Sequence, residues 1–223
     1  MSLTFYLKRN FNRLPIGPKL GTYISKIPYQ LRPGIGSTYL NVQVDIELLS
    51  KKPELKKKYI FKKVKDLTQH AYENTIFYKS YYDEMHFDPY KLKSFEDLEQ
   101  IPITNKALFQ RWSLEDRSSS KNGLAKSNTG GSTGEPLTFY TDSKAIGNEW
   151  AHLHKIWGEL NYQPSSLKLI FAGRSNVKNG LQYDLLRHSL VVDIYKDFEE
   201  IKEKLFFYSR KYKIQFLHVY PSA

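Results

Sequence analysis

Residues 127–136 read Ser-Asn-Thr-Gly-Gly-Ser-Thr-Gly-Glu-Pro and run directly into residues 137–140, Leu-Thr-Phe-Tyr, which have the composition of a strand. Three glycines and four hydroxyl residues stand within these ten positions. Glycine lets the backbone adopt positive φ and brings N–H groups close to an anion, while Ser and Thr add hydroxyl donors without bulk. The composition is typical of a loop that binds phosphate, and also of a plain flexible connection.

Two familiar phosphate-binding motifs are excluded. The sequence contains no Gly-Lys-Ser or Gly-Lys-Thr, which a Walker A loop requires, and the glycine spacing in residues 127–136 is not G-x-G-x-x-G. The loop therefore belongs to another class.

The order of its residues resembles the Ser/Thr-Gly-rich phosphate loop of the adenylate-forming, AMP-producing ligases. It is most similar to the phenylacetate-CoA-ligase-like branch associated with capsular polysaccharide biosynthesis. Other segments resemble the same branch, so that the similarity covers the chain from Asp45 onward: residues 77–79 (Phe-Tyr-Lys), 87–89 (Phe-Asp-Pro), 98–106 (Leu-Glu-Gln-Ile-Pro-Ile-Thr-Asn-Lys) and 220–223 (Tyr-Pro-Ser-Ala). Glu135 and Leu137 stand where many superfamily members carry a lysine.

The resemblance implies ATP and Mg²⁺ as cofactors and a small carboxylic acid as substrate. The carboxylate would attack the α-phosphorus of ATP, pyrophosphate would leave, and an acyl-adenylate would form. Such a transfer needs positioning and charge neutralisation more than a protein nucleophile, and no catalytic residue or protein metal ligand is assigned. The residues expected to bind the nucleotide are Thr129, Gly130, Gly131, Ser132, Thr133 and Gly134 in the loop, with Tyr220 at the end of a strand.

Ligases of this family continue past the Tyr-Pro-Ser-Ala segment into an adenine-binding part and a small domain with a catalytic lysine. The resemblance therefore predicts the N-terminal part of such an enzyme, incomplete for catalysis alone. Two alternatives stay open. The chain is a non-catalytic remnant or subunit that binds a partner supplying the missing half, or it is a basic nucleic-acid-binding protein.

Composition indicates a globular protein, since 40% of the 223 residues are hydrophobic and 15% are aromatic. No apolar run approaches the ~20 residues of a membrane span, and Lys8, Arg9 and Arg13 interrupt the only N-terminal stretch that could serve as a signal peptide. We therefore expect a cytoplasmic protein without a membrane span. The absence of cysteine excludes disulfides and thiolate chemistry.

The net charge of +11 favours anionic partners. The positive charge is densest between residues 51 and 65. In and just after this stretch, Ile60, Val64, Leu67 and Ala71 recur with helical spacing. The lysines then fall on the outer face of an amphipathic helix, which is more typical of a solvated surface than of a nucleic-acid site. No nucleic acid is expected as a partner.

The predicted fold is α/β, with a helical N-terminal region followed by part of a mixed α/β sheet domain of the adenylate-forming-ligase type. Residues 1–44 are rich in Pro and Gly and are predicted to form an irregular arm. Residues 45–117 are predicted to form a helical lead-in region, in which a helical pattern dominates over 53–82 and a short helix covers 94–100. Residues 118–223 are predicted to form an incomplete nucleotide-binding domain.

Within that last region, residues 118–128 are expected to be a polar linker. Helices are predicted from residue 141 or 142 to Gly158, with an apolar stripe of Ile146, Trp150, Leu153 and Trp157, and around 201–212. Strands are predicted at 167–172, 191–195 and 214–219.

Other groups of reactive side chains give only weak evidence for a metal-binding or catalytic site. His152 and His154 are two apart on a predicted helix and point to different faces, so they are interpreted as surface or structural residues. Nothing in the spacing of Asp184, His188 and Asp193 indicates a catalytic relay.

Overall fold

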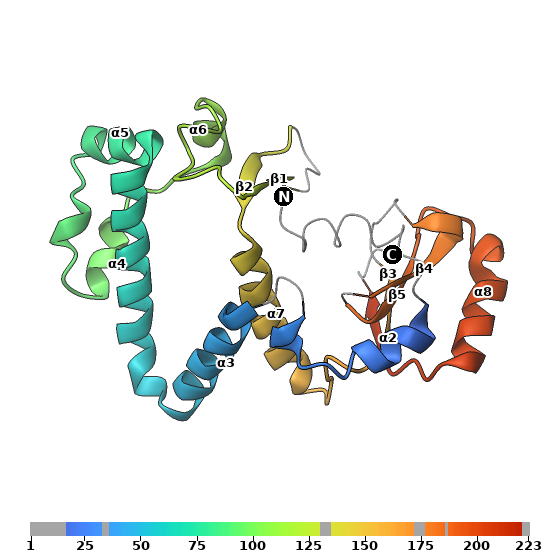
Figure 1. The fold of residues 1–223 in the computed structure, drawn as a ribbon. Helices are drawn as coiled ribbons and strands as arrows, with labels where there is room; N and C mark the ends of the chain where they lie inside the picture. The colour runs from blue at the N-terminus through green and yellow to red at the C-terminus, as the bar shows by residue number, and fades with distance from the viewer. Residues whose placement is uncertain (1–16, 33–35, 130–134, 172–176, 186, 220–223) are drawn as a thin grey trace. The chain divides into compact units, whose positions relative to one another are not determined.

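The computed structural model describes residues 17–32, 36–129, 135–171, 177–185 and 187–219 (Figure 1). Its fold is mixed α/β, with a helical N-terminal region. The chain divides into two compact units. The described part of Met1–Gln43 joins Ser143–Ala223 in what we call the sheet unit, and Val44–Asp142 forms the hairpin unit. The first residues therefore group with the sheet, and residues 118–142 group with the helices that precede them.

The described part of residues 1–44, predicted to form an irregular arm, contains helical elements. Helix α2 spans Pro18–Ile24, the 3₁₀ helix η2 spans Tyr29–Leu31, and α3 spans Gly36–Lys51. Pro18 occupies the first turn of α2, where its missing N–H costs no hydrogen bond and its fixed φ suits a helix. Helix α3 continues from the sheet unit into the hairpin unit.

The hairpin unit is mostly helical before its two strands. Its described elements are η3 (Pro53–Leu55), α4 (Lys56–Asn74), α5 (Ile76–Glu84), η4 (Pro89–Lys91), η5 (Glu96–Gln100), α6 (Lys106–Gln110), β1 (Ala125–Asn128) and β2 (Thr138–Thr141). The short helix predicted near residues 94–100 is thus present as η5.

The helical pattern predicted over residues 53–82 is interrupted at Thr75. This residue takes an extended conformation, with φ −133° and ψ 137°, and its side chain accepts a hydrogen bond from the backbone N–H of Tyr78. It therefore ends α4 and caps α5, as β-branched hydroxyl residues do at helix N-termini. Phe77 then lies fully buried, with ring contacts to Phe109 and Trp112.

The buried face of α4 differs from the predicted stripe. Leu67 is 66% exposed, whereas Thr68 is buried, with its hydroxyl bonded to the carbonyl of Val64. Two of the α4 lysines have partners within the unit, because Lys65 Nζ donates to the carbonyl of Leu92 and Lys57 pairs with Glu96. These contacts favour a structural role for this surface of α4 over a nucleic-acid-binding role.

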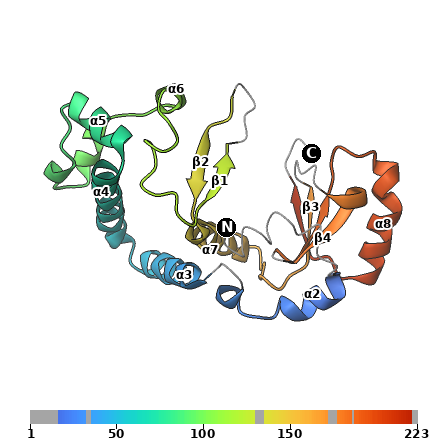
Figure 2. The ribbon, with the colours of Figure 1, turned by 45° about the horizontal axis from the view of Figure 1, so that its top comes forward.

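Strands β1 and β2 form an antiparallel hairpin, with Ala125 opposite Thr141 and Asn128 opposite Thr138 (Figure 2). The expectation of a polar linker over residues 118–128 is wrong for its last four residues, which form β1. Their sequence, Ala-Lys-Ser-Asn, has low strand propensity. Pairing with the more apolar β2 makes them a strand.

The sheet unit contains four strands in the order β4-β5-β3-β6. They are β3 (Lys168–Phe171), β4 (Leu181–Asp184), β5 (Ser189–Val192) and β6 (Phe216–Val219). Strands β5 and β6 run parallel to β3, and β4 runs antiparallel to β5. The strands predicted at 167–172 and 214–219 are present within two residues of their expected ends, whereas the strand predicted at 191–195 begins two residues earlier and ends three residues earlier, as β5. Strand β4 was not predicted, because the polar residues of Leu-Gln-Tyr-Asp hide its pattern.

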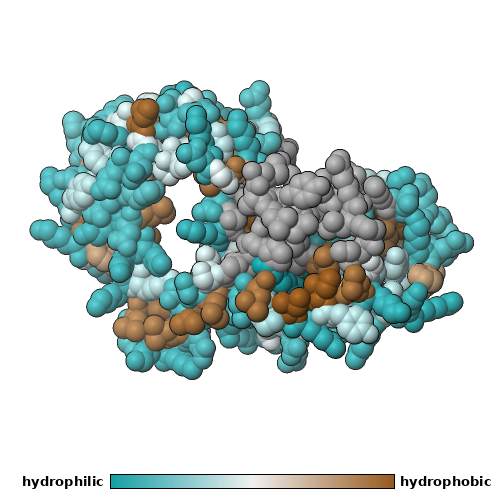
Figure 3. Space-filling view, viewed as in Figure 1, coloured by the Kyte–Doolittle hydropathy of each residue, from teal (hydrophilic) through white to brown (hydrophobic). Residues whose placement is uncertain are grey.

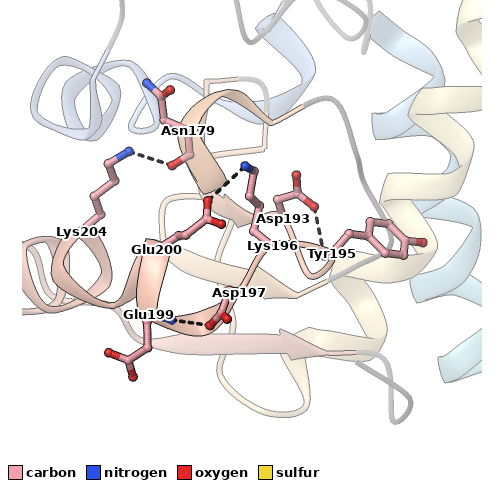
Figure 4. A network of polar contacts seen from close by, with 8 residues as sticks. All are labelled: Asn179, Asp193, Tyr195, Lys196, Asp197, Glu199, Glu200 and Lys204. Atoms are coloured by element: carbon pink, nitrogen blue, oxygen red, sulfur yellow. Dashed lines mark hydrogen bonds and ion pairs between the residues drawn. The ribbon is translucent and has the colours of Figure 1, made fainter.

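Helix α8 (Phe198–Lys211) covers one face of this sheet, as both ribbon views show (Figures 1 and 2). The helix predicted around residues 201–212 is confirmed, and its residues Ile201, Leu205 and Tyr208 pack into the same core as strand residues Leu169 and Leu190. Asp197 caps the start of the helix, because its carboxylate accepts the N–H of Glu199 (Figure 4). Burial of this face is the main force that holds helix and sheet together.

Polar contacts fix the start of α8 against the sheet connections. Lys196 Nζ lies 3.0 Å from the Glu200 carboxylate, and Lys204 Nζ donates to the carbonyl of Asn179 at 2.7 Å (Figure 4). Asn179 adopts φ 54° in the turn before β4, a conformation that Asn tolerates better than most residues. The bond from Lys204 joins the helix to the turn that precedes the unpredicted strand β4.

Helix α7 (Ser143–Gly158) follows the hairpin, and its predicted span is confirmed. Ile146 and Trp150 are buried and Leu153 and Trp157 are partly buried, as their helical spacing predicts. Side chains of a strand alternate between the two faces, so Lys168 lies on the face opposite Leu169 and the α8 core. There Lys168 meets the rings of Trp150 and Trp157.

Candidate functional site

The predicted phosphate loop lies between the two strands of the hairpin. At its base the N–H of Thr129 donates to the carbonyl of Leu137 at 2.9 Å, and the N–H of Leu137 donates to Oγ1 of Thr129 at 3.0 Å. The Thr129 hydroxyl accepts this bond and keeps its own proton, which it can donate to an anion. Of the predicted nucleotide-binding residues, Thr129 is described, while Gly130, Gly131, Ser132, Thr133, Gly134 and Tyr220 lie outside the described residues.

Neighbouring side chains hold the hairpin in place. Arg117 Nη1 donates to the carbonyl of Thr138 at 3.2 Å, and Gln110 Nε2 donates to the carbonyl of Glu135 at 3.4 Å. Lys126 Nζ lies 5.8 Å from the centre of the Tyr140 ring. Arg117 and Lys126 are thus cationic residues beside the hairpin strands, where the hydroxyl of Tyr140 also donates to the acidic Glu115 at 3.3 Å.

A second group of polar residues is buried in the sheet unit. Lys168 is 1% exposed, and its Nζ donates to the hydroxyl of Tyr162 at 2.7 Å. The same ammonium lies 4.7 to 5.0 Å from the ring centres of Tyr162, Trp150 and Trp157. Aromatic rings attract a cation through the negative charge of their faces, which offsets part of the cost of burial.

Two more cations are buried in this unit. Arg187 forms an ion pair with Asp184, with 2.5 Å between Nη1 and Oδ2. Arg32 lies on the ring of Tyr29, 4.7 Å from its centre, and donates to backbone carbonyls that include that of Ser25. Paired or bonded cations of this kind are compatible with burial.

Two histidines lie among these cations. The pKa of His154 is lowered to about 3, mainly by burial and then by the positive charges of Lys168 and Arg32. The pKa of His188 is lowered to about 4, again mainly by burial and then by the charges of Arg32 and Lys168. Their Nδ1 atoms lie 2.9 Å and 2.7 Å from the hydroxyls of Tyr39 and Tyr183 respectively. Both imidazoles are neutral at pH 7, where they act as hydrogen-bonding groups.

A cavity of about 190 Å³ adjoins the edge strand β6 and reaches Lys168. Its other lining residues are mostly aromatic or aliphatic: Trp157, Leu160, Tyr162, Phe216, Leu217, His218 and Val219. The cavity lies beside the strand that leads to Tyr220.

The sequence did not identify Lys168 or Arg187 as buried cations. It indicated a surface or structural role for His154 and no role for His188. His152 is exposed and His154 is buried, which confirms the expectation that they point to different faces. A charged residue inside the apolar run 167–172 was the signal for Lys168. Its aromatic surroundings come from residues up to 18 positions away in the chain and are set by tertiary structure.

Within the described ranges, no group of three or more His, Cys, Asp and Glu side chains is placed to hold a metal ion. Across the same residues, no helix has the length and apolar character needed to cross a membrane. Comparisons of the chain with protein-family models, curated proteins and solved structures find no match. The family resemblance therefore stays a prediction from the sequence.

Proposed function

We propose that this chain carries the phosphate-binding loop of an ATP-dependent, AMP-forming carboxylate ligase-like protein, related to those of capsular or other polysaccharide biosynthesis. The observation that supports it best is the position of the Gly/Ser/Thr segment between β1 and β2, with its base closed by Thr129 and Leu137. A loop at the end of a two-stranded ladder has backbone N–H groups that the ladder does not use, and these can bind phosphate.

The residues of the loop and the hairpin offer hydrogen-bond donors and positive charge, which suit the phosphates of ATP. Thr129 has a hydroxyl proton to donate, while Ser132 and Thr133 add hydroxyls and the glycines add N–H groups without side-chain bulk. Arg117 and Lys126 supply positive charge at the hairpin. Mg²⁺ bound with the nucleotide would supply further charge neutralisation. In this proposal the protein binds and orients the departing phosphates.

Titration of the protein with Mg²⁺-ATP tests the loop. The double substitution Ser132→Ala with Thr133→Val removes two hydroxyl donors and is expected to weaken binding at least tenfold, because a hydrogen bond to a charged group contributes about 1.5–3 kcal/mol. The matched control is Ser119→Ala with Ser120→Ala, since both serines are exposed and precede the hairpin. Equal affinity in the two double variants, or no binding of ATP by the protein, would contradict the proposal.

Exchange of labelled pyrophosphate into ATP, measured with a panel of carboxylic acids, tests the reaction itself. Exchange that requires both ATP and an acid supports ligase activity in this chain. ATP binding without exchange supports instead a non-catalytic subunit, and co-purification with a chain that restores exchange would identify the partner.

A further inference from the structure

Residues 17–32 form a segment with two distinct faces. Its inward residues are buried against the sheet unit: Pro18, Gly21, Ser25, Tyr29 and Arg32. Its outward residues are large and apolar, with exposed fractions of 52% for Leu20, 66% for Tyr23, 44% for Ile27 and 70% for Leu31. Figure 3 shows apolar surface gathered over α2 and the residues that follow it.

The inward face anchors this segment. Gly21 packs so closely on the side chain of Tyr183 that a Cβ atom there would overlap the ring. Arg32 donates to the carbonyls of Ser25, at 2.5 Å, and of Pro164, at 3.4 Å. The apolar row is thus held outward by contacts on its opposite side, so the segment cannot bury this row by rotating without losing those contacts.

The segment itself carries charge of one sign. Residues 17–32 contain Lys19, Lys26 and the buried Arg32 and no Asp or Glu. Lys19 and Lys26 flank the row and are exposed, and Lys26 Nζ lies 5.9 Å from the centre of the Tyr23 ring. A partner for this surface must offer both apolar contact and negative charge.

We propose that residues 17–32 bind the surface of an anionic membrane. Leu20, Ile27 and Leu31 would enter the boundary between headgroups and acyl chains, which is how amphipathic segments bind membranes. The amphipathic ring of Tyr23 suits the headgroup level, and the ammonium groups of Lys19 and Lys26 would contact anionic headgroups. A fluid lipid surface suits a single row of protruding side chains because it needs no complementary shape.

A fluorophore at one position tests the contact directly. The chain has no cysteine, so Tyr23→Cys offers a unique site for an NBD label in the full chain. Vesicles of phosphatidylcholine with 30% phosphatidylserine are expected to shift its emission to the blue and to raise its intensity. The same label at Phe207→Cys, an exposed position on α8, is the control and should not respond.

Co-sedimentation with the same vesicles tests the residues. Leu20→Ser with Ile27→Ser is expected to lower the partition coefficient at least tenfold, whereas the matched pair Phe206→Ser with Phe207→Ser on α8 should leave it unchanged. Lys19→Gln with Lys26→Gln is expected to lower it about fivefold per lysine, and the control is Lys62→Gln with Lys63→Gln on α4. High salt should weaken binding to anionic vesicles.

Several results would overturn this proposal. They are the absence of vesicle binding, equal binding to pure phosphatidylcholine, and equal losses in the α8 or α4 control pairs. An NBD response to added RNA or to higher protein concentration, but not to vesicles, would identify a nucleic acid or a second copy of the chain as the occupant. Circular dichroism of each variant confirms that the exposed substitutions leave the fold intact.

Discussion

Gly21 shows how one residue places the N-terminal segment on the sheet unit. A Cβ atom at this position would overlap the hydroxyl and ring of Tyr183, which is itself buried and bonded to His188. A shift of the Tyr183 ring that relieved the overlap would disturb this packing and the hydrogen bond to His188. The requirement here is for close approach and not for an unusual backbone conformation.

We expect Gly21→Ala to lower the free energy of unfolding by about 1–3 kcal/mol, the usual cost of overpacking. Gly158→Ala is the matched control, because nothing lies within 4 Å of a Cβ atom there and alanine favours a helix. Chemical denaturation measures both variants. Equal stability of the two would show that α2 does not pack against Tyr183.

The buried histidines predict a dependence of stability on pH. Their folded-state pKa values of about 3 for His154 and about 4 for His188 lie below the ordinary value of about 6.5 for an unfolded histidine. Below pH 6.5 the unfolded chain gains protons that the folded protein does not. Their contribution to stability is therefore complete above pH 6.5 and is lost as pH falls toward 4 and 3.

When the pH falls from 7.5 to 5, each of these histidines is expected to lower the free energy of unfolding by about 2 kcal/mol. His154→Gln and His188→Asn remove the titrating groups, and asparagine suits the positive φ of 43° at position 188. Denaturation of each variant at the two pH values should show a smaller loss than in the parent protein. The exposed His152→Gln is the control, and a loss unchanged in all three variants would refute the assignment.

At the scale of elements, the hairpin depends on the side chain of Thr129 as well as on strand pairing. The ladder of β1 and β2 is four residues long, and the N–H of Leu137 just beyond it bonds to the Thr129 hydroxyl. This bond continues the hydrogen bonding between the two sides of the hairpin one residue beyond the ladder, toward the proposed phosphate loop. A short two-stranded ladder gains little stability by itself.

We expect Thr129→Val to make the Leu137 amide exchange with solvent about fivefold faster, which corresponds to the loss of about 1 kcal/mol for one hydrogen bond. Thr129→Ser keeps the hydroxyl and should preserve the parent rate. Hydrogen exchange followed by NMR measures both. The same rate in the valine variant would mean that the hydroxyl does not hold this amide.

The elements also differ in how far sequence predicts them. Helices α7 and α8 repeat apolar residues with helical spacing, and each has one buried face, so their spans and stripes were predictable. Strands β1 and β4 have no such pattern, and each depends on an antiparallel partner across a turn or loop. The stripe on α4 was predicted one position away from the buried Thr68, because a hydroxyl bonded to its own helix can be buried like an apolar group.

At the scale of the whole molecule, the sheet unit and the hairpin unit have separate cores. Leu190 and Val192 are fully buried in the sheet unit, and Phe77 and Leu92 are buried in the hairpin unit. In the sequence, the residues of the hairpin unit stand between the two stretches that form the sheet unit. Separate cores of this kind permit local unfolding of one unit without the other.

Phe77→Ala is expected to destabilise the hairpin unit by about 3–5 kcal/mol, because it removes a fully buried ring. Hydrogen exchange measured by mass spectrometry should show faster exchange in α4 and α5 and unchanged exchange in β3 and β5. Leu190→Ala should give the reverse pattern. Equal acceleration in both units by either substitution would show that they unfold as one.

The sequence by itself determined the mixed α/β class, the amphipathic helices α7 and α8, three strands of the sheet and the composition of the proposed phosphate loop, because each depends on spacing within a short stretch. Tertiary structure alone decided that Lys168 is enclosed by aromatic rings and that residues 17–32 turn Gly21 inward and Leu20 outward. Those arrangements depend on which distant residues share a face, and burial of a charge or exposure of an apolar row is set by such neighbours.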